Sequence, residues 1–507
     1  MLIPDIVLAR LKEFSVLPLT VQKDGSLLPD QVLAKCATGQ FDAVSAWLCD
    51  KKPPSLPGTD FRVGPIGRHG DYDFTLIILT VVAKKWLDDL SPAASQNLLD
   101  NLLVLKGANL LAERWFLGLI PETENHLLLS NVSCYLTNEV LHARTQRDEY
   151  DNSKNGVHTY LMAYLGKIND NGFYEYNSKP YSSWTIRALQ FLYSYTVNAE
   201  IKTLTRTILD RLFFKYACQT WRGYLVGPFR RRHDHLRDRI RENDFYAAWL
   251  LAFTDYIPDQ EDPNWIVNDY FPAILATRTQ SYMPPKEFLD IALDQSKSFW
   301  ARAKYSNLEL TYREPSFAIF GGGHSDRAYL IPTDEDAVVQ PTCLLTDDGA
   351  TKVSELLRFE PNQFFWANNT GVYRNFACGL NPVVPATLAI KRVEGNFLFL
   401  EVGSCYVALW HARTYGCFEA VDRAEFESFE AFWTAVLANN HDTEPRMKNG
   451  TYRNTRGDLI TFDCTASTKD WLIQSVLTAD NTLVVGGSAC TSWPQVAVTI
   501  GARLPLV

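Results

Sequence analysis

The sequence predicts an α+β fold in which a helical part comes first and a strand-rich part follows. Two observations support this order. Apolar residues recur at helical spacing through about the first 310 residues, and short runs of β-branched and aromatic residues replace that pattern after residue 315. Helices and strands therefore occupy separate parts of the chain, which favours two packed domains over alternating βα units.

The first part is expected to be a succession of helices. The helical spacing of apolar residues is found in Asp30–Leu48, Phe74–Leu87, Ala94–Leu117, His126–Ala143, Gly156–Leu165, Tyr181–Val197, Ile201–Gln219, Asn243–Phe253, Asn264–Ala276 and Pro285–Phe299. Connections such as residues 51–60 and 168–180 are rich in Pro, Gly, Asn and Asp. Antiparallel helix pairs arranged in a ring would bury such a series, so we expect an α/α toroid, incomplete or closed, over residues 1–315.

The second part is expected to be an antiparallel β-sandwich over residues 316–507. Strand-like runs are separated by turn signals, and they cover residues 316–322, 337–345, 364–377, 386–412, 458–465, 481–487 and 495–500. Alternating polarity in Thr387–Arg392 and Asn396–Val402, on either side of Glu394-Gly395, predicts a hairpin. A single helix is expected near Phe426–Ala438.

Composition and charge narrow the functional class. Hydrophobic residues make up 46% and charged residues 21% of the 507 residues, which is typical of globular domains and argues against disorder. The net charge of −9 disfavours non-specific binding of nucleic acid. The longest apolar run, Phe74–Ala83, is too short to span a bilayer, so we expect no membrane insertion.

Signals for compartment and cofactors are sparse. The N-terminus lacks the basic region and cleavage site of a secretory signal, which predicts a cytoplasmic protein, or a secreted or periplasmic one if a leader has been removed. The ten cysteines form no CxxC pair and are expected to be ordinary buried thiols. Nucleotide-binding, hydrolase and zinc-protease motifs are absent, and His233-Asp234-His235 has no evident third ligand. We therefore expect no metal and no other cofactor.

The first of three polar clusters is Glu124-Asn125-His126, at the start of a predicted helix. Thr123 or Asn125 could cap that helix, and Glu124 would complement its dipole. His126 has no capping role. Side by side, Asn125 and His126 could donate hydrogen bonds to an anion held at the helix N-terminus.

The second cluster is the connection of residues 171–181, which contains three tyrosines and Glu175 before a helix. It could be a structured turn whose tyrosines pack on a rim. Alternatively, Tyr176 or Tyr181 transfers a proton and Glu175 assists it.

The third cluster is basic. Residues 230–241 hold six arginines against two aspartates in a chain that is acidic overall. The segment could be solvated or paired with acidic residues elsewhere. Arginine also binds carboxylates with two parallel hydrogen bonds, so the segment could form the wall of an anion site.

Together the three clusters suit one reaction, the elimination of a uronic acid within a polysaccharide. Neutral donors such as Asn125 and His126 could stabilise charge that develops on the uronate carboxyl group when the C5 proton leaves. A tyrosine is a poor base near its ordinary pKa of about 10, but an adjacent arginine favours the tyrosinate. The same tyrosine or a neighbour could then protonate the leaving O4 atom.

These residues also resemble a known family. The Glu-Asn-His triplet, residues 171–181 (NGFYEYNSKPY), the arginine-rich segment after residues 221–229 (WRGYLVGPF) and residues 70–74 (GDYDF) are similar to toroidal polysaccharide lyases. The nearest are the glucuronan and alginate lyases of polysaccharide lyase family 38 and their relatives. The resemblance covers roughly residues 60–320.

The resemblance implies a set of roles. Asn125 and His126 would neutralise the uronate, Tyr181 would be the base, and one of Arg230, Arg231 or Arg232 would lie against the tyrosine or the substrate. The expected catalytic residues are thus Tyr181, His126, Asn125, Arg230 and Arg232. The expected substrate-binding residues are Glu124, Glu175, Tyr176, Asp73 and His233. The expected partner is an acidic polysaccharide or oligosaccharide.

Two other functions fit the same sequence. A glycoside hydrolase on the same toroid would need two carboxylates across a cleft, for which Glu124 and Glu175 are candidates and Asp73 is a third. A non-catalytic carbohydrate-binding protein would need none. Elimination creates an unsaturated uronyl end that absorbs ultraviolet light, so product absorbance separates these possibilities.

Overall fold

The computed structural model shows an α+β protein with helices first and antiparallel sheets second, as the sequence predicts. It describes residues 5–19, 29–63, 66–111, 122–173, 177–178, 181–221, 224–225, 229–233, 246, 250, 254, 282–294, 296, 298–304, 308–322, 337–340, 342–347, 353–359, 370–380, 382–384, 388–412, 415–440, 450–464, 473–485 and 497–500. For several strands this description covers the backbone alone. The two predicted helices at Asn243–Phe253 and Asn264–Ala276 lie almost entirely outside these ranges.

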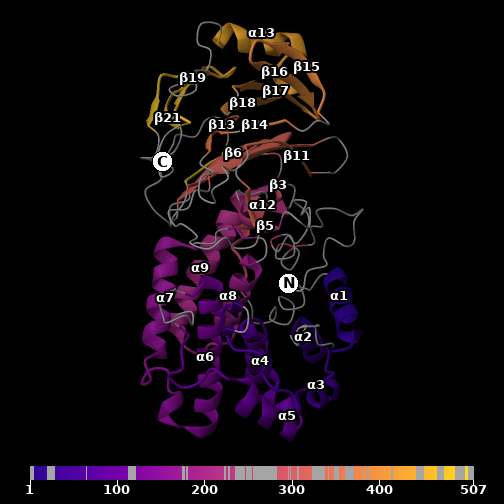
Figure 1. Cartoon of the computed structure of the whole chain (residues 1–507), viewed down its shortest axis with the longest axis vertical. Coiled ribbons are helices and arrows are strands. Elements are labelled where there is room, and N and C mark those ends of the chain that lie inside the picture. Colours follow the sequence, from indigo (N-terminus) through magenta and orange to yellow (C-terminus); the bar gives the residue numbers. More distant parts are fainter. Residues whose placement is uncertain are drawn as a thin grey trace.

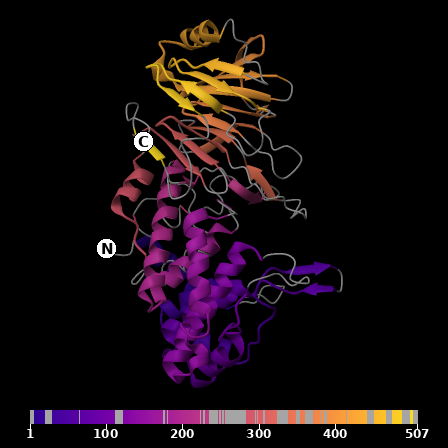
Figure 2. The same ribbon diagram turned by 90° about the vertical axis from the view of Figure 1, so that its left-hand side faces the viewer.

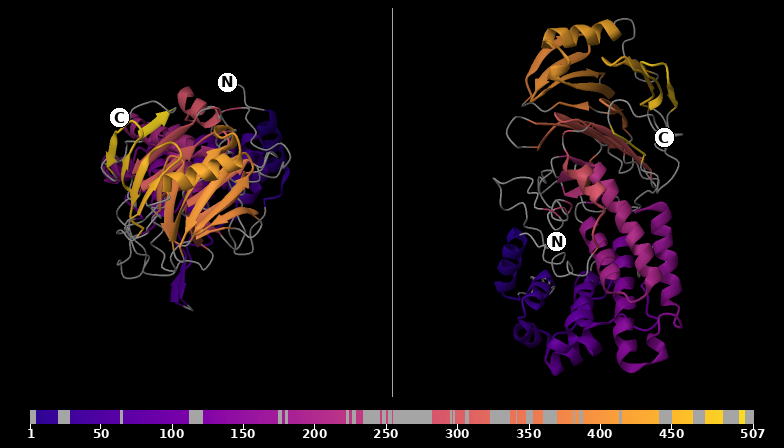
Figure 3. Two further views of the ribbon diagram at one scale, coloured as in Figure 1. Left: turned by 90° about the horizontal axis from the view of Figure 1, so that it is seen from above. Right: turned by 180° about the vertical axis from the view of Figure 1, so that it is seen from behind.

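The helices form the lower tier of the molecule in Figure 1. They are α1 (Asp5–Val16), α2 (Pro29–Ala37), α3 (Phe41–Leu48), α4 (Tyr72–Trp86), α5 (Pro92–Asn97), α6 (Glu124–Thr145), α7 (Val157–Asn171), α8 (Ser182–Tyr195), α9 (Ala199–Cys218) and α12 (Lys286–Leu293). Helices α2, α4, α6 and α8 pack side by side in one row. Helix α3 packs on α5 and α7 packs on α9, and these two pairs lie toward opposite sides of the tier (Figures 1 and 3).

Burial distinguishes the row from its neighbours. Helices α4, α6 and α8 are buried on nearly all faces, including polar positions such as Thr80, Asn131 and Gln190. Helix α7 instead buries a single stripe, which includes Val157, Leu161, Leu165 and Ile168. A helix that is apolar all round lies inside a larger core, whereas an amphipathic helix covers that core. The row α4–α6–α8 is therefore the centre of the helical tier.

The described strands form sheets of seven, six and four strands and three two-stranded sheets, and every described strand pair is antiparallel. The seven-stranded sheet has the order β14-β11-β10-β8-β7-β6-β23: β14 (Pro382–Val383), β11 (Val353–Phe359), β10 (Thr342–Asp347), β8 (Phe317–Gly322), β7 (Leu308–Arg313), β6 (Phe299–Lys304) and β23 (Ala497–Ile500). The six-stranded sheet has the order β12-β13-β18-β17-β16-β15: β12 (Gly371–Tyr373), β13 (Phe376–Leu380), β18 (Tyr415–Asp422), β17 (Cys405–His411), β16 (Phe397–Val402) and β15 (Ile390–Glu394). The four-stranded sheet runs β19 (Gly450–Arg453), β20 (Leu459–Phe462), β21 (Ile473–Leu477) and β22 (Leu483–Val485).

The seven-stranded sheet lies between the helical tier and the six-stranded sheet (Figure 1). Trp300, Leu310 and Phe317 from the first sheet share one apolar core with Val372 and Leu409 from the second. On the other face of the six-stranded sheet lies α13 (Phe429–Asn440), whose Phe432 ring contacts the rings of Tyr406 and Phe399. The β part is thus layered, with one sheet facing the helices.

Short two-stranded elements complete the fold. The hairpin of β1 (Phe61–Val63) and β2 (Ile66–Arg68) projects from the helical tier, as Figure 2 shows. Strands β3 (Thr220–Trp221) and β4 (Tyr224–Leu225) pair after α9, and β5 (Phe229–His233) pairs with β9 (Ala337–Gln340).

A buried polar cluster joins the helical tier to the seven-stranded sheet. Glu309 on β7 is only 1% exposed. Its carboxylate accepts hydrogen bonds from Lys215 Nζ at 3.1 Å and Gln219 Nε2 at 2.6 Å, both at the end of α9. Asn177 donates a hydrogen bond to the same carboxylate at 2.9 Å. This residue lies five positions before the first residue of α8, Ser182. The segment that leads into α8 is therefore anchored to the sheet.

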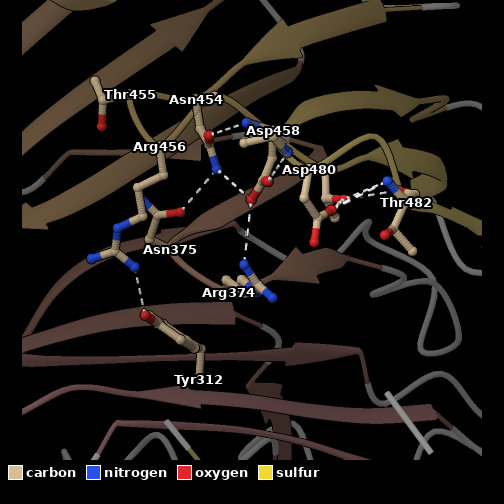
Figure 4. A network of polar contacts seen from close by, with 12 residues as sticks. Tyr312, Arg374, Asn375, Asn454, Thr455, Arg456, Asp458, Asp480 and Thr482 are labelled. Atoms are coloured by element: carbon tan, nitrogen blue, oxygen red, sulfur yellow. Dashed lines mark hydrogen bonds and ion pairs between the residues drawn. The ribbon is translucent and has the colours of Figure 1, made fainter. Parts of the chain in front are cut away.

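A second polar network fastens the four-stranded sheet to the rest of the β part (Figure 4). Asp458 accepts a hydrogen bond from Asn454 Nδ2 at 3.3 Å and lies 3.7 Å from Arg374 Nη1. Asn454 Nδ2 also lies 3.3 Å from Asn375 Oδ1, and Arg456 Nη1 donates to the Tyr312 hydroxyl at 2.7 Å. Side chains from three sheets are thereby linked.

Several predicted elements are confirmed. The hairpin at Glu394-Gly395 forms between β15 and β16, and Gly395 has the positive φ of 57° that a tight turn requires. Seven of the eight described cysteines are buried thiols, and only Cys49 is partly exposed. Within the described ranges, no helix combines the length and apolar character needed to cross a bilayer.

Other predicted boundaries are wrong. The segment predicted as one helix over 30–48 is two helices, because Gly39 adopts a φ of +77° between them. Helix α5 ends at Asn97 and continues only as a π-helical turn at Leu98–Leu102, well short of residue 117. Strands β6 and β7 precede residue 316, so the sheet begins before the predicted domain boundary.

Candidate active site

The first turns of α4, α6 and α8 lie together at one end of the central row. His126 in the first turn of α6 contacts Asp73 in the first turn of α4. The ring of Phe74 lies 5.0 Å from the His126 ring and 4.7 Å from the Trp184 ring on α8, measured between centroids. Three helix N-termini therefore meet around Phe74.

A tight backbone pairing shapes the start of α4. The amide of Leu56 donates to the carbonyl of His69 at 2.9 Å, and the amide of Asp71 donates to the carbonyl of Gly58 at 2.7 Å. A Cβ atom on Gly70 would lie 2.3 Å from that Gly58 carbonyl, so only glycine fits there. The pairing leaves the Gly58 amide free to donate to Asp73 Oδ1 at 2.9 Å.

Asp73 holds His126 in one orientation. The Nδ1 atom of His126 lies 2.8 Å from Asp73 Oδ2, and Asp73 is completely buried. A buried carboxylate at Nδ1 fixes the proton on that nitrogen and orients the ring. The Nε2 atom lies 3.7 Å from Asp71 Oδ1, and half of the Asp71 side chain is exposed. Asp73 was expected to bind the substrate, but its side chain is completely buried and contacts His126 instead.

The carboxylates around His126 favour its protonated form. Burial by itself lowers the pKa of His126, but the charge and hydrogen bond of Asp73, followed by the charges of Glu122 and Asp71, raise that pKa above the ordinary value of 6.5. The sequence suggested a neutral histidine. The structure instead favours an imidazolium, which is a stronger donor to an anion.

Glu122 is a member of the site that the sequence did not indicate. Its carboxylate accepts hydrogen bonds from the Thr59 hydroxyl, the Thr59 amide at 3.1 Å and the Thr123 amide at 2.9 Å. Burial tends to raise the pKa of Glu122, but the Thr59 hydroxyl and the nearby His126 outweigh that effect and lower it. Glu122 is therefore a fixed negative charge beside His126.

The side-chain oxygen of Asn125 is engaged at the start of α6. This Oδ1 atom accepts hydrogen bonds from the Thr123 hydroxyl at 2.5 Å and the His126 amide at 2.7 Å. The oxygen is thus occupied at the start of the helix. Among the described residues, Asn125 Nδ2 donates to no other group, so it is the atom that remains for a ligand.

Tyr181 lies at the start of α8 and is half-buried. Its carbonyl accepts hydrogen bonds from the amides of Trp184 at 3.0 Å and Thr185 at 3.1 Å. On the same helix, the guanidinium of the buried Arg187 lies 4.0 Å from the centroid of the Trp184 ring. The position at the N-terminus of α8 favours negative charge near this tyrosine.

The other predicted residues are placed less fully. Glu124 is half-buried in the first turn of α6, and its carbonyl accepts a hydrogen bond from the Tyr164 hydroxyl at 3.1 Å. Arg230, Arg232 and His233 belong to β5, whose side chains lie outside the description. Glu175 and Tyr176 lie outside the described residues altogether.

No metal-binding cluster is found in the described part of the chain. No group of three His, Cys, Asp or Glu side chains there could hold an ion. Comparison with known proteins adds no assignment, since no family model and no curated protein matches this chain.

Proposed function

We propose that this protein is a polysaccharide lyase that cleaves a uronic-acid-containing polymer by β-elimination without a metal. The observation that carries the proposal is the meeting of the α4, α6 and α8 N-termini, which brings the Asp73–His126 pair and Asn125 to the same end as Tyr181. Each of the three helices contributes a residue type that this reaction needs.

In the first step the substrate carboxylate would be bound by Asn125 Nδ2 and His126 Nε2. The positive end of α6 adds to this binding, because carboxylates are stabilised at helix N-termini. The charge on the carboxyl group grows when C5 loses its proton, so fixed donors stabilise the transition state more than the bound substrate. The imidazolium form of His126 suits this role.

In the second step Tyr181, as a tyrosinate, would remove the C5 proton. The C5–H electron pair forms the C4=C5 double bond, and the C4–O4 bond breaks with its electron pair on O4. A proton on O4 completes the cleavage, and Tyr181 is then positioned to return the one it took. No water is consumed. Arg230 and Arg232 remain predicted contributors to this charge balance.

The arrangement of helices and sheets agrees with this class of enzyme. Helices α2, α4, α6 and α8 form a row, and the packed pairs α3–α5 and α7–α9 lie beside it. We take this row to be part of an α/α toroid, because a toroid is built from such packed helices. The two large sheets share one core, as expected in a β-sandwich. The toroid would present its helix N-termini toward the polymer.

The test is a panel of glucuronan, alginate, pectate and hyaluronan incubated with the full chain, with ultraviolet absorbance as the readout. At least one polymer should give unsaturated product. Tyr181→Phe should abolish the signal, whereas Tyr150→Phe, at the opposite end of α6, should leave it unchanged. Cleavage without a rise in absorbance would favour the hydrolase, and binding without cleavage would favour the carbohydrate-binding protein.

A chelator supplies an independent check. Activity should persist in excess chelator, because no step above uses a metal. A loss of activity that a divalent ion restores would contradict the proposed mechanism.

A further inference from the structure

An open cavity of about 1040 Å³ lies beside the candidate active site. The segment Cys49–Leu56 forms one wall, and His69, Asn97, Asn101 and Val104 complete it. Its volume is slightly above the usual range for ligand sites, about 300 to 1,000 Å³. None of its lining residues belongs to the elimination machinery described above.

The cavity and the active site share a wall. His69 Nδ1 lies 3.3 Å from Asp60 Oδ2, and the amide of Asp60 donates to Asp71 Oδ1 at 3.1 Å. The same Asp71 oxygen lies 3.7 Å from His126 Nε2. A short series of contacts therefore leads from the cavity to the predicted uronate-binding histidine.

The cavity is basic in a protein that is acidic overall. Lys51, Lys52 and His69 line it, against a single acidic residue, Asp50. Lys51 Nζ lies 5.5 Å from the centroid of the Trp47 ring, a contact that holds the ammonium group at the wall. Clustered lysines raise the local concentration of anions, so the cavity favours a negatively charged ligand.

The remaining lining is suited to a sugar ring. Pro53, Pro54, Leu56 and Val104 present apolar surface, and Leu56 is 57% exposed. Sugar rings carry C–H groups on their faces and polar groups on their edges. A cavity with an apolar surface and a few cations can contact both parts of an acidic sugar.

The cavity wall is fixed before any ligand binds. Asn97 Nδ2 donates to the carbonyls of Leu48 at 2.7 Å and Lys51 at 3.0 Å. These bonds tie the lysine segment to α5. A preformed wall loses little conformational freedom on binding, which improves affinity.

We infer that this cavity binds acidic sugar residues of the polymer outside the cleavage site, with Lys51 and Lys52 contacting their carboxylates. The inference rests on the proposed function for the identity of the ligand. It adds that substrate recognition extends from the helix N-termini to the α3–α5 side of the helical tier.

The test compares Lys51→Ala/Lys52→Ala with Lys286→Ala/Lys391→Ala, a control that removes two exposed lysines elsewhere. Calorimetry on the full chain uses a hexasaccharide of glucuronic acid, with a neutral cellulose hexasaccharide as the comparison probe. The first variant should bind the acidic probe about tenfold more weakly, and the control should match the wild type. On polymer, KM should rise in the first variant while kcat stays constant.

The two proposals fail in different ways. If unsaturated product forms and the two variants have equal Kd and KM, the cavity does not bind the acidic sugar, and the proposed lyase activity stands. If binding of the acidic probe depends on the two lysines but no unsaturated product forms, the proposed lyase activity is wrong and binding in the cavity is supported. Equal binding of the acidic and neutral probes would overturn the role given to Lys51 and Lys52.

Discussion

Replacing Asp73 by asparagine perturbs the candidate site at its most buried point. The asparagine oxygen can still accept the hydrogen bond from the Gly58 amide, now 2.9 Å from Asp73 Oδ1. Its NH₂ group would face His126 Nδ1, which is 2.8 Å from Asp73 Oδ2. Two donors would then oppose each other unless the His126 proton moves to Nε2. If the proton of a neutral His126 stays on Nδ1, its Nε2 atom has no hydrogen to donate.

The loss in the free energy of unfolding follows from the hydrogen bond that is removed, between His126 and the Asp73 carboxylate. A hydrogen bond to a charged group contributes about 1.5–3 kcal/mol, and this one is completely shielded from water. We expect that loss in the free energy of unfolding. Misorienting a histidine in this way lowers kcat by about 10²- to 10⁴-fold in comparable sites.

The change in stability should depend on pH. The pKa of His126 is above its ordinary value of 6.5 in the folded protein, so its interaction with Asp73 stabilises the fold fully below that value and loses its effect as pH rises through the folded pKa. Without the Asp73 carboxylate, His126 loses the largest of the effects that raise its pKa, so that pKa should fall. The difference in melting temperature between wild type and Asp73→Asn should therefore be larger in acid than in mildly alkaline buffer.

The assay is an NMR titration of the His126 ring alongside thermal unfolding at several pH values. Asp71→Asn is the matched control, because Asp71 is half exposed and 3.7 Å away, and it should shift the titration less. An unchanged His126 titration in Asp73→Asn would refute the reasoning, whatever happens to activity.

Three further substitutions probe the remaining parts of the account. Tyr181→Phe should lower kcat by at least about 10²-fold with substrate affinity and melting temperature retained, since only the base is removed; steady-state kinetics with normal turnover would exclude Tyr181. Asn125→Ala should lower kcat by about 10²- to 10³-fold and destabilise the fold by about 1 kcal/mol, because both a donor and the contacts at the start of α6 are lost; a change in stability alone would leave only the structural role. Glu309→Gln should destabilise the protein by about 3–5 kcal/mol in denaturant titrations, because the buried Lys215 loses the carboxylate that lies 3.1 Å from its ammonium group. A second change, Lys215→Met, should recover much of that loss, and no recovery would contradict the pairing.

Hydrophobic periodicity carried most of the correct sequence predictions. The helices predicted at Phe74–Leu87, His126–Ala143 and Ile201–Gln219 agree with α4, α6 and α9 to within about two residues. These segments are long and strongly patterned. The segment 94–117 failed because its leucines pack in a π-helical turn and an irregular stretch, where Gly107 has a φ of +66°. Periodicity alone does not separate such a stretch from a helix.

The site was only partly accessible from the sequence. Asn125 and His126 stood out because they are adjacent at a helix start, and the structure places both there. The roles of Asp73 and Glu122 depend on contacts between distant parts of the sequence: His126 contacts Asp73, 53 positions away, and Glu122 contacts Thr59, 63 positions away. A local pattern does not contain such contacts. Glu122 lies two residues before the Glu124-Asn125-His126 cluster and belongs to no recognisable motif. Its contact with Thr59 is formed only in the folded protein.

The proposed function is cleavage by elimination at the point where the N-termini of α4, α6 and α8 meet. Mass spectrometry of the fragments from a uronic-acid polymer tests it most directly. We predict that each cleavage by the wild-type chain yields a non-reducing end lighter than a saturated end by one water molecule, and that Tyr181→Phe yields no such end. Fragments that have each gained a water molecule would show hydrolysis and contradict it.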